Sequence, residues 1–237
     1  MQVFGTSTPI PKNSPSATTS SVQAPSIRCR FPSTAGWARN ALTIGRRPLV
    51  VSYVGDLRDE KGIDLLPGIM ASVRRAGHGP AQVLFRIQGN LPVAGVTART
   101  RRARAALEAA AQDVGGVELV KGPLDSDAYM DLMLQSDVLL IPYAPVHYAA
   151  RSSGIFVEAL AAGIPTVHPR NSWMGRNAAD RLGFGYSKPS EIAAGLQDMI
   201  VNYPRYEAAS KEFSPEWRAR NSAQRVAKII IENQARI

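Results

Sequence analysis

Short apolar runs alternate with helix-like segments from Pro48 onward, and this alternation constrains the fold more than any other feature of the sequence. The runs expected to be strands are Leu49–Gly55, Ala81–Gly89, Val117–Lys121, Asp137–Pro142 and Thr166–His168. The segments expected to be helices between them are Ile63–Ala76, Thr97–Gln112, Asp127–Gln135 and the middle of Arg151–Val167. Such spacing predicts βαβ units and therefore an α/β fold with a doubly wound parallel sheet. Ligands of such sheets bind at the carboxyl ends of the strands.

The charge of the chain is concentrated in its first part. The net charge is +9, and residues 1–49 carry six basic side chains without an acid. Residues 1–47 are rich in Ser, Thr and Pro and lack periodicity, so we expect a disordered tail or linker before a domain at 48–237. An organelle transit peptide is an open alternative for this tail. A basic balance of this origin is poor evidence for nucleic-acid binding.

The composition excludes several classes of protein. No apolar run reaches the roughly 18 residues that span a bilayer, and the single cysteine, Cys29, fits a reducing compartment such as the cytoplasm. No metal-ligand cluster, Cys–His pair, P-loop or G-x-G-x-x-G motif occurs. The sequence therefore gives no support to metal, cysteine or nicotinamide chemistry, and we expect no cofactor.

The stretch Arg151–Val167, RSSGIFVEALAAGIPTV, combines a loop, a short helix and a strand entry. Gly154 permits close approach of the backbone to a ligand, and the free N–H groups of a first helical turn bind anions. Glu158 lies about one turn further on, where a carboxylate accepts hydrogen bonds from two sugar hydroxyls. A ligand with a phosphate next to two neighbouring hydroxyls would fit both sites, and a nucleoside diphosphate with its ribose is such a ligand. The alternative is a core helix with Glu158 on its solvated face.

This stretch resembles the donor-binding motif of the retaining GT-B glycosyltransferases of the group 1, or family 4-like, type, E-G-F-G-x-x-x-x-E-A-M-A-x-G-x-P-V-V. Glu158 matches the second glutamate, and the resemblance implies that it binds the ribose. The position of the first glutamate is Ala150, so the usual contact to the donor sugar is missing. The resemblance covers roughly Pro48 to Ile237 and implies the Rossmann-like C-terminal half of the GT-B fold.

A second stretch, Gly55–Gly62 or GDLRDEKG, resembles the G-R-L-x-x-E-K-G loop of the same family. Lys61 matches directly, whereas Asp56 stands where the family has arginine, and we expect Arg58 to take that role. The alternative is a solvated charge cluster. The resemblance implies that the donor diphosphate binds to Arg58, Lys61 and the amides of Ser153, Gly154 and Ile155.

Two strand ends resemble the part of the family's site that lies under the nucleotide, namely FRIQGN at 85–90 and VKGPL at 120–124. The base contacts that the resemblance implies are Gly89, Lys121, Gly122 and Leu124. The candidates for contact with the donor sugar flank Ala150 and are His147, Tyr148 and Arg151. Ordinary strand ends and packing at the rim are the alternatives.

Beyond the last expected strand, we expect a loop at Asn171–Gly185, an amphipathic helix at Ser190–Tyr203 and a long closing helix at Pro215–Ile237. The basic polar face of the closing helix could contact an anionic membrane instead of bracing another domain.

The resemblance implies a domain that binds a nucleotide-diphosphate sugar, the donor substrate, for retaining transfer to an acceptor hydroxyl in glycan biosynthesis. It implies no protein nucleophile, and the sequence names no catalytic residue. The acceptor would bind to a further domain or partner chain, which residues 1–47 are too few to supply. The alternatives are a non-catalytic nucleotide-sugar module, a membrane-associated scaffold and a GT-B epimerase.

Overall fold

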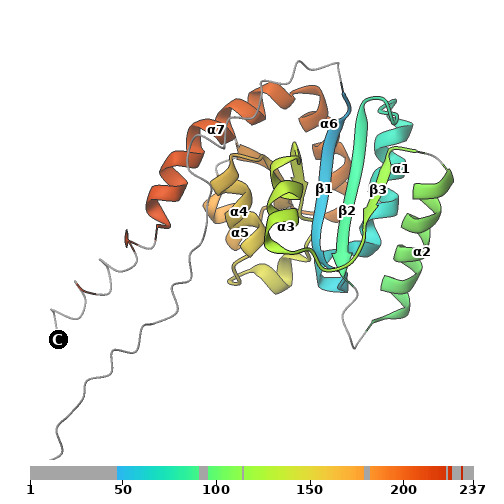
Figure 1. Ribbon diagram of the computed structural model, residues 1–237, viewed down its shortest axis with the longest axis horizontal. Helices are drawn as coiled ribbons and strands as arrows, with labels where there is room; N and C mark the ends of the chain where they lie inside the picture. The colour runs from blue at the N-terminus through green and yellow to red at the C-terminus, as the bar shows by residue number, and fades with distance from the viewer. Residues whose placement is uncertain are drawn as a thin grey trace, which may run out of the picture. The chain divides into compact units, whose positions relative to one another are not determined.

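A parallel six-stranded sheet with the order β3-β2-β1-β4-β5-β6 forms the centre of the fold (Figure 1). The computed structural model describes residues 47–90, 96–113, 115–178, 182–222, 224, 225 and 231. The strands are β1 (Leu49–Asp56), β2 (Val83–Asn90), β3 (Val117–Val120), β4 (Val138–Leu140), β5 (Thr166–Pro169) and β6 (Gly183–Tyr186). Every paired strand is parallel. The α/β doubly wound expectation is therefore confirmed, and the strand order reverses between β1 and β4.

Helices cover both faces of the sheet. They are α1 (Leu66–Arg75), α2 (Ala98–Asp113), α3 (Ser126–Leu134), α4 (Gly154–Ala162), α5 (Trp173–Asn177), α6 (Ile192–Val201) and α7 (Tyr203–Arg220). Residues of α1, α2 and α6 pack into one apolar core, and residues of α3, α4, α5 and the second half of α7 pack into another. Strand β1 serves both, because Val51 and Tyr53 belong to the first core and Val54 to the second. This alternation is the period of two that a strand imposes.

Side-chain caps set the starts of two helices near the carboxyl ends of the strands. The Asp125 carboxylate accepts a hydrogen bond from the Ala128 amide at 2.8 Å, so α3 starts at Ser126. The Ser153 hydroxyl accepts from the Phe156 amide at 3.4 Å, so α4 starts at Gly154. Each cap satisfies an amide that has no partner within its own helix.

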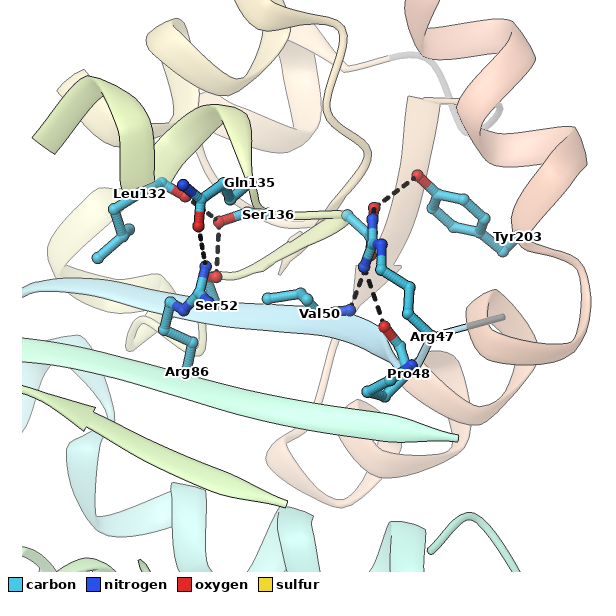
Figure 2. Close-up of polar contacts among 10 residues, drawn as sticks. Arg47, Pro48, Val50, Ser52, Arg86, Leu132, Gln135, Ser136 and Tyr203 are labelled. Atoms are coloured by element: carbon cyan, nitrogen blue, oxygen red, sulfur yellow. Dashed lines mark hydrogen bonds and ion pairs between the residues drawn. The ribbon is translucent and has the colours of Figure 1, made fainter. Parts of the chain in front are cut away.

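At the opposite, amino edge of the sheet, Arg47, Val50 and Tyr203 (labelled in Figure 2) form polar contacts with Asp137. The Arg47 guanidinium donates to both Asp137 carboxylate oxygens, at 2.7 and 2.8 Å. The Val50 amide donates to the same carboxylate at 2.8 Å, and the Tyr203 hydroxyl at 3.4 Å. We call Arg47, Val50, Asp137 and Tyr203 the amino-edge cluster. It fastens the start of β1 and the first turn of α7 to the residue before β4.

The expected loop at Asn171–Gly185 is wrong, because it contains α5 and β6. Strand β6 consists of the four residues GFGY, so the sequence shows no longer run of alternating apolar residues there. Its glycine serves close packing: a Cβ at Gly183 would lie 2.0 Å from the Thr166 carbonyl oxygen on β5.

The expected start of the closing helix at Pro215 is also wrong, because α7 starts at Tyr203 and includes Pro215. The start signal is the proline of the first turn, Pro204. Packing on α4 holds the helix through the interior proline: the Trp217 indole donates to the Val157 carbonyl at 3.1 Å, and Ser214 Oγ to Ala161 O at 2.6 Å. Most of the expected helix beyond Arg220 lies outside the described residues.

Within the described residues, no helix is both long and apolar enough to cross a membrane. The expected tail at 1–47 lies outside the described residues except for Arg47.

Candidate functional site

A pocket of about 340 Å³ opens where the strand order reverses, between the loops that follow β1 and β4. We call it the switch-point pocket. Open α/β sheets bind ligands in this crevice because neighbouring loops diverge there to opposite faces. Its described lining residues are Arg58, Glu60, Lys61, Tyr129, Tyr143, Tyr148, Arg151, Ser152, Ser153, Gly154, Ile155 and Glu158.

Two glycines with positive φ, one near the end of β1 and one in the loop after it, determine how this loop packs. Gly62 has φ 70°, and a Cβ there would lie 2.0 Å from the Pro142 carbonyl oxygen after β4. Gly55 has φ 123°, and a Cβ there would lie 3.0 Å from the Lys61 ammonium. Glycine at these positions therefore brings the two loops together and leaves room for the ammonium.

The Lys61 ammonium is half-buried and has no carboxylate within ion-pair distance among the described residues. It lies 5.8 Å from the centre of the Tyr143 ring. Burial lowers its pKa, the charges of Asp56 and Glu60 act in the opposite direction, and the charges of Arg58 and Arg151 add to the lowering. A partly desolvated cation of this kind favours an anionic ligand.

Arg58 lies in the same pocket, but its charge is already paired. Its guanidinium contacts the Asp56 carboxylate at 3.0 Å and the Glu60 carboxylate at 3.8 Å.

Two tyrosines with tilted, contacting rings line the switch-point pocket. The ring centres of Tyr143 and Tyr148 are 4.6 Å apart, and both side chains are buried. Burial raises the pKa of both phenols, so they remain neutral at physiological pH. The Arg151 guanidinium lies over the Tyr148 ring, 5.6 Å from its centre.

Glu158 faces the pocket from the second turn of α4 and accepts a hydrogen bond from the Tyr129 hydroxyl of α3. Burial, and then this hydrogen bond, raise the pKa of Tyr129. The hydroxyl is thus a neutral donor that fixes one oxygen of the Glu158 carboxylate.

Sequence reasoning missed four lining residues: Glu60, Tyr129, Tyr143 and Ser152. Tyr143 follows directly after the fourth expected strand, so the carboxyl-end rule could have found it. Tyr129 precedes Glu158 by 29 positions, and no periodicity connects the two.

The predicted base-binding residues do not gather in the switch-point pocket. Gly89, Lys121 and Gly122 line a separate cavity of about 670 Å³ between α2 and the ends of β2 and β3, which we call the α2 cavity. The buried Gln88 joins the two regions, because its amide oxygen accepts from Gly55 N at 3.0 Å and its amide nitrogen donates to Gly122 O at 3.3 Å.

Two further predicted contacts lie outside both cavities. Leu124 is half-buried and packs against the core under α4, and His147 is an exposed residue that lines neither cavity. Their proposed contacts to base and sugar stay predictions. The described residues contain no group of three His, Cys, Asp or Glu side chains that could hold a metal ion.

Several solved structures share this fold. Sucrose-phosphate synthase from Thermosynechococcus elongatus matches with a TM-score of 0.65 and 18% identity, over 87% of this chain and 49% of that one. Anabaena HepE, solved with UDP and glucose, matches with a TM-score of 0.63 and 17% identity, over 81% of this chain and 49% of that one. The C-terminal domain of the group 1 glycosyl transferase LpcC from Francisella tularensis matches with a TM-score of 0.54 and 16% identity, over 74% and 87%.

The chain has the fold of the C-terminal domain of GT-B glycosyltransferases, and the expected fold is thus confirmed. It spans about half the length of the first two of these structures. The sequence matches no protein-family model and no curated protein.

Proposed function

We propose that this chain is the donor-binding domain of a retaining glycosyltransferase and that its switch-point pocket binds a nucleotide-diphosphate sugar. The observation that carries this proposal is the half-buried Lys61 ammonium, which faces the start of α4 without a carboxylate partner among the described residues. The likeness to HepE, which was solved with UDP and glucose, supports the choice of ligand.

The diphosphate binds between the loop after β1 and the first turn of α4. Lys61 contributes a cation, and Ser153, Gly154 and Ile155 contribute N–H groups that have no partner within the helix. Packing does not require glycine at 154, since a Cβ there would meet no atom within 4 Å. The open space therefore suits a ligand that approaches the backbone. Arg58 remains a candidate for the second cation.

The ribose binds to Glu158. Tyr129 holds one oxygen of this carboxylate, which leaves the other oriented for a ribose hydroxyl. The base lies toward the α2 cavity, where Gly89, Lys121 and Gly122 surround it. Tyr148 lies where the donor sugar would contact the protein.

The chemistry is transfer of the sugar with retention at its anomeric carbon. The bond from that carbon to the diphosphate oxygen breaks, and the diphosphate keeps the electron pair. The acceptor hydroxyl attacks the same face of the sugar, and its proton passes to the departing diphosphate. Fixed cations and amides stabilise the charge that develops on the leaving group, so no protein nucleophile is needed.

The acceptor is held by a domain or partner chain that faces the pocket, in cytoplasmic glycan biosynthesis. A second candidate is a module that binds the nucleotide sugar without transfer. The observation that favours it is Ala150, at the position where the resembled motif has its first glutamate.

Calorimetry with UDP, GDP and ADP tests the ligand class, with the matching nucleosides as controls. One diphosphate should bind with at least about tenfold higher affinity than its nucleoside, because the diphosphate contacts are charge-assisted. Glu158→Gln should weaken binding of the ribonucleotide and leave its 2′,3′-dideoxy analogue unaffected. Equal affinity for diphosphate and nucleoside would contradict the proposal.

A further inference from the structure

Three cationic side chains of the described residues line the switch-point pocket, and they differ in their contacts with carboxylates. Arg58 contacts two carboxylates, of Asp56 and Glu60. Lys61 and Arg151 have no carboxylate within ion-pair distance among the described residues, and each lies over a tyrosine ring instead. A tyrosine face stabilises a cation but does not neutralise its charge. An anion entering the pocket therefore meets two cations, Lys61 and Arg151, that form no ion pair with a carboxylate of the described residues.

Arg151 is exposed, and its guanidinium lies over the ring of a buried tyrosine. Its guanidinium lies 5.6 Å from the centre of the Tyr148 ring, and that ring is buried against Tyr143. A planar guanidinium on an aromatic face loses little further freedom when it binds an anion. The residue also lies two positions before Ser153, the cap of α4. Its charge thus acts beside the free N–H groups of the first turn.

Arg151 and Lys61 act on the same volume. Both side chains line the switch-point pocket, and the positive charge of Arg151 contributes to the lowered pKa of Lys61. Two like charges in one pocket repel, and an anion between them removes that repulsion. Arg58 already contacts the carboxylates of Asp56 at 3.0 Å and Glu60 at 3.8 Å, so its charge is partly neutralised before an anion enters.

We propose that Arg151, together with Lys61, supplies the cationic contacts to the diphosphate, and that Arg58 stays paired with Asp56 and Glu60. This inference rests on the proposed function for the identity of the whole ligand. The anion contact itself is a property of the pocket. In this arrangement Lys61 comes from the loop after β1 and Arg151 from the loop after β4. The diphosphate therefore binds between these two loops, at the point where the strand order reverses.

The experiment measures binding of inorganic pyrophosphate, UDP, GDP and ADP to the full chain by calorimetry. Arg151→Gln should weaken pyrophosphate binding by about 10- to 100-fold, the range for a charge-assisted hydrogen bond. Arg151→Lys keeps the charge but lacks the planar guanidinium, so its pyrophosphate affinity should lie between those of the unaltered chain and Arg151→Gln. Arg58→Gln should weaken binding by less than about fivefold, the scale of an exposed ion pair.

Arg205→Gln is the matched control, because Arg205 lies over Tyr206 at 5.9 Å on α7, outside the pocket. It removes the same kind of stacked cation and should leave pyrophosphate binding unchanged. Thermal melting of each variant shows whether the fold is intact.

The outcomes separate this inference from the proposed function. A loss at Arg58 as large as that at Arg151 overturns the inference and leaves nucleotide binding standing. If pyrophosphate binds and no nucleoside diphosphate binds more tightly, the proposed function fails, and the comparison of Arg151 with Arg58 still decides the anion contact. If pyrophosphate does not bind to the unaltered chain at millimolar concentration, both are overturned.

Discussion

The charged side chains at the two ends of the strands, the amino edge and the carboxyl edge of the sheet, differ in whether they have partners in the fold. At the amino edge, the Asp137 carboxylate has a side-chain exposure of 4% and accepts hydrogen bonds from Arg47, the Val50 amide and Tyr203. At the carboxyl edge, Lys61 is half-buried and has no carboxylate partner among the described residues. Removing one partner of a buried, hydrogen-bonded charge destabilises the fold, whereas a partly buried charge without a carboxylate partner is stabilised by an anionic ligand. The comparison therefore distinguishes Asp137, which stabilises the fold, from Lys61, which we propose binds an anionic ligand.

The largest expected effect is on stability at the amino edge. Asp137→Ala leaves the Arg47 guanidinium and the Val50 amide without their acceptor and should lower the free energy of unfolding by about 3 kcal/mol. Urea unfolding followed by circular dichroism measures this loss. A loss below about 1 kcal/mol would show that the amino-edge cluster does not hold the fold.

The next effect is on binding at the carboxyl edge. Lys61→Met keeps the length of the side chain and removes its charge, so pyrophosphate binding should weaken by about 1.5–3 kcal/mol. The free energy of unfolding should not fall, because the charge has no ion pair to lose among the described residues. Calorimetry and urea unfolding on one preparation give both values, and a variant that is less stable but binds normally would reverse the comparison.

A pH titration tests the same cation without a large structural change. Burial holds the pKa of Lys61 below its usual value, and an anion in the pocket favours the charged form. Pyrophosphate affinity should therefore be full below this lowered pKa and decline as the pH rises through it. Lys61→Arg stays charged and should abolish that decline. A decline of the same size and at the same pH in Lys61→Arg would assign it to another group.

The smallest expected effect concerns Tyr129. Tyr129→Phe removes the hydrogen bond to Glu158 and should lower the free energy of unfolding by about 1 kcal/mol. Binding of a ribonucleoside diphosphate should weaken, because the carboxylate loses its fixed orientation, whereas pyrophosphate binding should stay the same. If pyrophosphate binding falls as well, Tyr129 shapes the whole pocket.

The sequence predicts the five strands with clear apolar runs, but not β6. Strand β6 reads GFGY, and its place depends on the contact of Gly183 with β5, which is distant in sequence. The start of α7 was missed for a related reason. Two prolines offer start signals, and only packing of Trp217 on α4 shows that Pro215 lies inside the helix.

The candidate site divides in the same way. Lys61, Gly154 and Glu158 belong to two short motifs, so their meeting at the carboxyl edge follows from the parallel sheet. The paired state of Arg58 and the bond from Tyr129 to Glu158 depend on side-chain conformation, which no spacing reveals.

The contact between Gly62 and the Pro142 carbonyl has a consequence for engineering this pocket. We expect most variants at position 62 to misfold, because a Cβ there would lie 2.0 Å from the Pro142 carbonyl oxygen. The segment Pro145–Tyr148 offers more freedom at its tip, where Val146 is 78% exposed. Because Val146 and His147 line neither of the two cavities, randomising them alters the surface next to Tyr148 and leaves the pocket lining and the contact of Gly62 with Pro142 unchanged.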